Sequence, residues 1–247
     1  KRFFFSKFIN CIVDGLAYSW PLVDPKASIN YDASHAACNA KGTGWHLASI
    51  PERAVINHLI YKSSFIPRGN TQYGKHHTYT YEVGETTATE SDGSGGTRTT
   101  RTATGSGPAT WFHDGTRNGI ADYVGDVWKW MSGLRIYKGE IQIFVGNLAA
   151  KQVSHLAAST YWKAILPNGS LVEPGTPGTL KYTKDFKIAT DTGAAGSTYT
   201  ENFGNLVAGT GVTTIPEILK ELFLAPVSGV THTGAFWINN EDERLPV

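Results

Sequence analysis

Alternation of apolar and polar residues predicts β-strands in four stretches of the chain. Turn residues divide three of these stretches: Asp14-Gly15 in the first, Lys138-Gly139 in the second and Pro167-Asn168-Gly169 in the third. Short turns of this composition between apolar runs are typical of antiparallel hairpins. The predicted hairpins and a final single strand occupy residues 3–19, 134–145, 162–172 and 234–240.

Apolar residues at helical spacing predict three helices, over residues 30–41, 50–64 and 214–224. Asn30 can cap the first helix. The pairs Ser49/Glu52 and Thr214/Glu217 have the three-residue spacing of a capping box at the start of the other two. The apolar stripe of the second helix, which we expect to face the core, comprises Val55, Ile56, Leu59 and Ile60.

Two regions interrupt this pattern. Residues 85–110 are rich in Thr, Ser and Gly and can bury little surface, which predicts a long mobile loop inserted in the domain. We interpret residues from about 147 to 233 as a second insertion. The whole pattern predicts one α+β domain over residues 1–247, with a mostly antiparallel sheet against which the helices near 31–41 and 50–64 pack.

The run Asp126–Met131 has the period of a strand, and it contains two tryptophans. In a strand, Trp128 and Trp130 would share one face, so we expect both rings to be buried. Truncating a buried Trp to Ala costs about 3–5 kcal/mol, whereas whole domains are stable by about 5–15 kcal/mol. We therefore favour a structural role for the pair over ligand stacking.

The same region carries the pattern G-x-x-D-x-x-G-[ND]-V-W-x-W. It resembles the signature strand of the formylglycine-generating-enzyme type of C-type lectin fold. That family usually has Asn where this chain has Asp126 and Glu where it has Lys129, and both changes alter charge contacts rather than the fold. The residues that match the signature are Gly119, Asp122, Gly125, Asp126, Val127, Trp128 and Trp130.

Further segments resemble the variable proteins of diversity-generating retroelements within that fold. They are residues 67–74 and 101–115 and the final run with Trp237 and Arg244, whereas the Gly-Trp-His-Leu run with Trp45 resembles the wider superfamily. The resemblance implies a scaffold that displays a diversified site for a protein or cell-surface ligand, located on a cell surface or in a phage tail. In that family the ligand surface follows an Arg-Leu-Pro run. The resemblance therefore implies a variable segment C-terminal to Val247. We expect a chain that ends at Val247 to bind no specific ligand.

Charge and hydropathy bear on the partners. The 247 residues include 22 Lys and Arg against 21 Asp and Glu, a net charge of +1. This balance gives no reason to expect a nucleic acid partner. No run approaches the roughly 18 apolar residues of a membrane helix, so we expect no membrane insertion. Residues 1–14 lack the pattern of a signal peptide, and both ends resemble cuts within a longer polypeptide.

Candidate chemistry is sparse. The formylglycine-generating oxidase, one alternative function, needs a pair of cysteines late in the chain, and the only cysteines are Cys11 and Cys38. We expect two buried thiols, although one disulfide stays open. His76-His77 has no further ligands at a recognisable spacing. We therefore expect no catalytic residue, metal or cofactor. The other alternative is a structural virion subunit, and an oligomer is compatible with either role.

Overall fold

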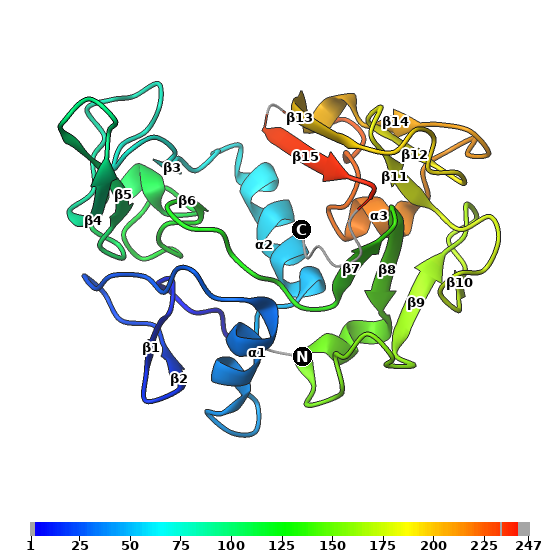
Figure 1. Ribbon diagram of the computed structural model, residues 1–247, viewed down its shortest axis with the longest axis horizontal. Helices are drawn as coiled ribbons and strands as arrows, with labels where there is room; N and C mark the ends of the chain where they lie inside the picture. The colour runs from blue at the N-terminus through cyan, green and yellow to red at the C-terminus, as the bar shows by residue number, and fades with distance from the viewer. Residues whose placement is uncertain (1–2, 233, 242–247) are drawn as a thin grey trace. The chain divides into compact units, whose positions relative to one another are not determined.

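The computed structural model describes residues 3–232 and 234–241. The chain forms two compact units: the first comprises residues 1–45 and 58–129, and the second comprises residues 46–57 and 130–247. Strands predominate in the described residues and helices are few, which makes the protein α+β as the sequence predicts (Figure 1). That the whole chain forms a single domain stays a prediction.

The first unit is built from short paired strands. β1 pairs with β2 and β4 with β5, both antiparallel, whereas β3 pairs with β6 in parallel. Helix α1 lies against β2. The elements are β1 (Cys11–Val13), β2 (Leu16–Tyr18), α1 (Tyr31–Asn39), β3 (Gly69–Asn70), β4 (Thr86–Ser91), β5 (Thr97–Thr102), the 3-10 turn η1 (Ala109–Trp111) and β6 (Val124–Gly125).

Local signals at the start of the chain are confirmed. Asp14 and Gly15 form the turn between β1 and β2 with positive φ angles of 51° and 77°. This is the left-handed geometry that a two-residue hairpin turn needs. The Asn30 side chain accepts a hydrogen bond from the Ala33 amide at 2.9 Å and so caps α1. Both features depend only on neighbouring residues.

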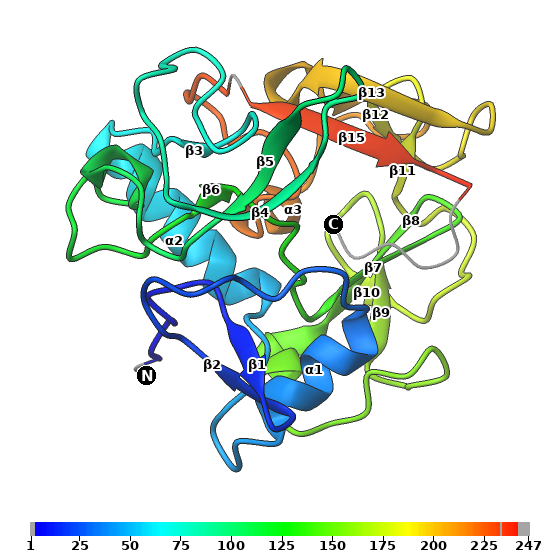
Figure 2. The same cartoon turned by 60° about the vertical axis from the view of Figure 1, so that its left-hand side comes forward.

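The predicted mobile loop at residues 85–110 is wrong. Strands β4 and β5 lie side by side there as an antiparallel hairpin (Figure 2). Threonine is β-branched and favours strands, and the cross-strand pair Glu90–Arg98 forms a salt bridge at 2.7 Å. The carboxylate of Asp92 closes the turn by accepting the amides of Ser94 and Gly96. The low apolar content therefore marks an exposed hairpin rather than an irregular loop.

A curled seven-stranded sheet dominates the second unit. Its strand order is β10-β9-β8-β11-β12-β14, and β7 also pairs with β8. All its pairings are antiparallel except β12 with β14. The strands are β7 (Leu134–Tyr137), β8 (Glu140–Phe144), β9 (Trp162–Ile165), β10 (Leu171–Val172), β11 (Lys181–Thr183), β12 (Lys187–Ala189) and β14 (Val207–Ala208).

The hairpins predicted at 134–145 and 162–172 are confirmed as β7–β8 and β9–β10. A separate antiparallel pair joins β13 to β15, so the strand predicted at 234–240 is also present. Because residues 147–233 supply five strands of the seven-stranded sheet, they take part in its framework. The remaining elements are the 3-10 segments η2 (Val145–Ala150) and η3 (Phe203–Asn205), β13 (Ser197–Asn202), α3 (Glu217–Glu221) and β15 (Ala235–Asn239).

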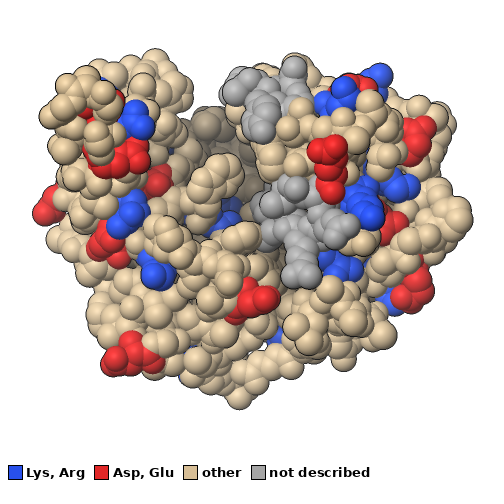
Figure 3. All heavy atoms as spheres, viewed as in Figure 1, with Lys and Arg blue, Asp and Glu red and all other residues tan. Residues whose placement is uncertain are grey.

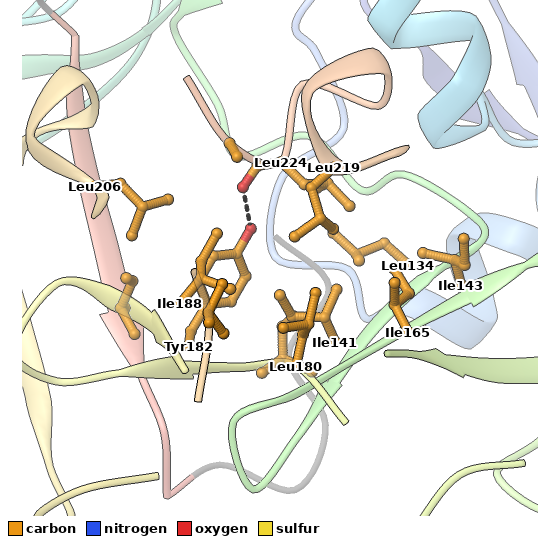
Figure 4. Packing of buried hydrophobic residues seen from close by; sticks show 14 of the residues in the cluster. Leu134, Ile141, Ile143, Ile165, Leu180, Tyr182, Ile188, Leu206, Leu219 and Leu224 are labelled. Carbon is orange, nitrogen blue, oxygen red and sulfur yellow. Dashed lines mark hydrogen bonds between the residues drawn. The ribbon is translucent and has the colours of Figure 1, made fainter. Parts of the chain in front are cut away.

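The main hydrophobic core of the second unit lies against this sheet (Figure 4). Leu219 of α3 is fully buried among strand residues, and Ile50 joins the same cluster. The hydroxyl of Tyr182 donates to the carbonyl of Leu224, which satisfies the only polar atom of a fully buried ring. Each fully buried aliphatic side chain contributes about 1.5–3 kcal/mol, so this cluster supplies most of the unit's cohesion.

Helices α2 (Ile50–Ser63) and α3 depart from prediction in detail. On α2, Ile56 is buried, but Val55 and Leu59 are 45% and 52% exposed. The buried residues of α2 are Ile50, Glu52, Ala54, Ile56 and Ile60. The Glu52 carboxylate caps the helix by accepting the Ser49 amide at 3.1 Å. Helix α3 begins after Pro216 rather than at residue 214, because a proline disfavours helical geometry in the residue before it.

Candidate functional site

The signature segment begins with a tight approach of two strands in the first unit. Gly125 of β6 pairs with Asn70 of β3 and has a φ of 74°. A β-carbon at this position would lie 2.2 Å from the Asn70 carbonyl oxygen. The next amide, of Asp126, donates to that same carbonyl at 2.8 Å. Only glycine fits here, so the match of Gly125 to the signature has a physical basis.

The carboxylate of Asp126 holds three parts of the first unit together. Its Oδ1 accepts hydrogen bonds from the Asn70 amide group at 3.0 Å, from the Thr102 backbone amide at 2.8 Å and from the Thr102 hydroxyl at 3.0 Å. These donors come from β3 and the end of β5. Bonds to a charged acceptor are roughly twice as strong as neutral ones. Aspartate at this position therefore strengthens the turn.

A second carboxyl, Asp122, is buried beside this turn with 1% of its surface exposed. Its Oδ2 accepts the Gly105 amide at 2.7 Å. Burial raises its pKa to about 6, the Gly105 amide opposes that rise, and the charge of Asp126 adds to it. Among the described residues, Asp122 Oδ1 and Asp126 Oδ2 are buried without a hydrogen-bond partner. The segment thus contains a buried carboxyl, Asp122, that interacts with the half-buried carboxyl of Asp126.

Lys129 supplies the cation of this cluster. Its ammonium donates to the carbonyl of Gly125 at 2.6 Å, and the carbonyl of Val127 lies at 3.4 Å. Its charge also lowers the pKa of Asp122. A side chain from the end of the turn therefore folds back over the start of it, and this fixes the backbone on either side of residue 128.

The prediction that Trp128 is buried in a strand is wrong. Residues 126–131 form no strand, and the Trp128 side chain is 95% exposed. Trp130 is partly buried and belongs to the second unit. The reason is backbone geometry: Asp126 has a φ of 67°, which ends the extended chain directly after β6. The Gly-Asp dipeptide was the available signal, since both residues tolerate the left-handed region.

The other predicted positions are divided between the two units. Gly119 is buried, and a β-carbon there would lie 2.1 Å from Asp114 Oδ1. Trp45 is 52% exposed and has the Lys41 ammonium 3.9 Å from its ring centre. Trp237 is half-buried on β15 in the second unit. Arg244 lies outside the described residues.

Sequence reasoning missed a buried polar cluster around Glu82. This carboxylate is 4% exposed and forms a salt bridge with Arg68. It also accepts the Thr110 hydroxyl at 2.9 Å and the indole N–H of Trp111 at 3.1 Å. Arg68 holds the pKa of Glu82 below its usual value. No local sequence pattern predicts this cluster, because its members are up to 43 positions apart in the chain and meet only in the folded unit.

The histidine and cysteine residues considered for metal or redox chemistry can be described directly from the structure. His76 Nδ1 accepts the backbone amides of Thr78 and Tyr79 at 3.1 and 3.0 Å, so His76 organises a loop. Cys11 and Cys38 are free thiols, but they are half-buried rather than buried as the sequence predicted. Within the described residues, no three His, Cys, Asp or Glu side chains form a group that could hold a metal ion.

A shallow groove of about 300 Å³ lies elsewhere on the first unit. Its walls carry Cys11, Lys26 and the ion pair of Asp24 with Arg101, whose closest atoms are 2.8 Å apart.

On the face drawn in Figure 3, acidic and basic side chains are interspersed. In the described part of the chain no helix is long and apolar enough to span a bilayer. The sequence matches no protein-family model and no curated protein.

Proposed function

We propose that this chain is a non-catalytic display scaffold of the C-type lectin type, related to the variable proteins of diversity-generating retroelements, which binds a protein or cell-surface ligand. The observation that carries the proposal is Trp128, which matches the family signature, is 95% exposed and stands on a turn fixed from both sides. The resemblance noted in the sequence supports the family, and the turn supports a binding role.

The physical argument concerns the cost of exposing a large ring. Indole is among the most favourable side chains to bury, and Trp is enriched among the few residues that dominate the energy of protein interfaces. Here the bonds of Asp126 and Lys129 hold the backbone around Trp128. A rigid anchor loses little conformational entropy on binding, which raises affinity. The turn is therefore suited to presenting Trp128 to a ligand.

The two carboxyls support a structural rather than a catalytic use of the signature. General acid–base catalysis needs a carboxyl within hydrogen-bond reach of a substrate. Asp122 is 1% exposed, and one oxygen of Asp126 already accepts three hydrogen bonds. An assay for oxidation of a cysteine-containing sulfatase peptide is expected to give no product, and turnover of that peptide would overturn the non-catalytic proposal.

The decisive experiment is to sequence the DNA on both sides of the coding region. We expect a reverse-transcriptase gene and a template repeat of part of the coding sequence. Neither feature would be found beside a gene for a purely structural virion subunit, so their absence would overturn the retroelement assignment. Finding this chain as a fixed component of purified virions, with no such genes nearby, would favour the structural alternative.

A further inference from the structure

A second exposed aromatic surface lies on the first unit, apart from the signature turn in sequence. It comprises Tyr73, His77, Tyr79 and Tyr81, and we call it the tyrosine face. The three tyrosines are 48%, 41% and 75% exposed. Tyr79 and Tyr81 contact edge to face, with their ring centres 6.1 Å apart. Tyrosine dominates antibody binding loops because it combines a large contact area with few rotatable bonds.

The backbone beneath the tyrosine face is held by hydrogen bonds. Gln72 and Lys75 exchange backbone bonds of 2.9 and 3.1 Å around the turn that carries Tyr73. The Gly84 amide donates to the Gly74 carbonyl at 3.0 Å, and the His76 amide donates to the Glu82 carbonyl at 3.1 Å. Because Glu82 is anchored in the buried cluster described above, the loop is tied to the interior of the unit.

Two guanidinium groups orient the rings themselves. Arg98 lies 4.3 Å from the ring centre of Tyr73, and Arg68 lies 4.2 Å from that of Tyr79. Each arginine is held in turn by a carboxylate, Glu90 for Arg98 and Glu82 for Arg68. The rings are therefore ordered before any partner arrives, and this reduces the entropy lost on binding.

The turn that carries Tyr73 holds this residue in an unfavourable backbone conformation. Tyr73 has a φ of 49°, in the left-handed region that bulky residues avoid. Asn or Gly would suit this position better. A strained aromatic residue at an exposed turn position is the kind of outlier that clusters at binding sites.

Charge indicates the kind of partner. Between residues 71 and 81 no Asp or Glu occurs, and the neighbouring carboxylates of Glu82 and Glu90 are paired with Arg68 and Arg98. Lys75 lies in this stretch and forms no ion pair among the described residues. We propose that the tyrosine face docks an acidic protein segment, one that carries Asp or Glu beside apolar side chains. The rings cover the apolar side chains and Lys75 attracts the carboxylates. This inference does not depend on the retroelement assignment, and it departs from the sequence-based expectation that a chain ending at Val247 binds no specific ligand.

The test uses a phage-displayed library of random dodecapeptides selected on the immobilised 247-residue chain. We expect the enriched peptides to carry Asp or Glu together with apolar residues. A synthetic copy of one such peptide should lose roughly tenfold or more in affinity when Tyr81→Ser or Tyr73→Asn is introduced, as interface anchors do. Lys75→Gln should weaken binding less, and high salt should weaken it further because exposed charges are screened.

The matched control is Tyr137→Ser, which removes a 40% exposed tyrosine from β7 in the second unit and should leave peptide affinity unchanged. Thermal melts of Tyr81→Ser and Tyr73→Asn should equal or exceed the parent value, which shows that the unit still folds. Failure to enrich any peptide, enrichment of peptides without acidic residues, or equal loss in the control would overturn the proposal. None of these outcomes bears on the genes beside the coding region.

Discussion

Replacing Asp122 with Asn should make the protein more stable at neutral pH and should remove part of its pH dependence. Asp122 is 1% exposed, and burial raises its pKa from 3.8 to about 6. Its folded-state pKa therefore lies above its unfolded-state pKa. The native state holds the proton more tightly than the unfolded state, so this group lowers stability as pH rises from about 4 to about 6.

The magnitude follows from that difference. A shift of roughly two pKa units corresponds to about 3 kcal/mol between the protonation states. Well below pH 3.8 the carboxyl is protonated in both states and carries no penalty, whereas well above pH 6 the full penalty applies. Asn keeps an oxygen to accept the Gly105 amide and carries no charge beside Asp126. We expect Asp122→Asn to gain about 2–3 kcal/mol at pH 7 and close to nothing at pH 4.

The assay is urea unfolding, followed by circular dichroism at several pH values between 4 and 8. The quantity of interest is the free energy of unfolding of Asp122→Asn minus that of the parent, because other titrating groups cancel in this difference. Asp14→Asn is the matched control, since Asp14 is an exposed turn residue of the same unit. Its difference should stay within about 0.5 kcal/mol at every pH.

Two results would refute the reasoning. A stability difference that does not change between pH 4 and pH 7 would mean that Asp122 keeps an ordinary pKa in the folded state. A loss of stability at pH 7 on substitution by Asn would mean that the ionised carboxylate makes a favourable contact that outweighs its burial.

Four further substitutions test the account of the first unit by urea unfolding. Trp128→Ala should change stability by less than about 0.5 kcal/mol because the ring is 95% exposed, whereas Trp111→Ala should cost about 3–5 kcal/mol because that ring is fully buried. Gly125→Ala should destabilise by more than about 1 kcal/mol, since its φ is 74° and the new methyl group would meet backbone; an unchanged midpoint would contradict the tight approach. Glu82→Gln should cost about 1–3 kcal/mol at pH 7, because it removes the charge that pairs with the partly exposed Arg68 and weakens the bonds from Thr110 and Trp111. Since the pKa of Glu82 is lowered, this cost should shrink as pH falls below 4.5, and a cost independent of pH would count against the ion pair.

Features that depend on adjacent residues could be predicted from the sequence. The turns at Asp14-Gly15 and Lys138-Gly139 form where expected, because a two-residue hairpin needs positive φ angles that Asp, Lys and Gly adopt in both turns. The cap at Asn30 forms because its side chain reaches an amide only three residues away. Short-range hydrogen bonds and backbone preferences are sufficient for these elements, and they yield the α+β class.

The candidate site depended on contacts between distant residues. Asp126 acquires its three hydrogen bonds only when β3 and β5 converge on it from 56 and 24 positions away in the chain. The same convergence turns the backbone and exposes Trp128, although the local pattern predicted a buried strand residue. Alternation specifies which side chains share a face, but which face meets the core is set by tertiary packing. A polar stretch such as 85–110 likewise becomes a hairpin through cross-strand pairs that composition does not reveal.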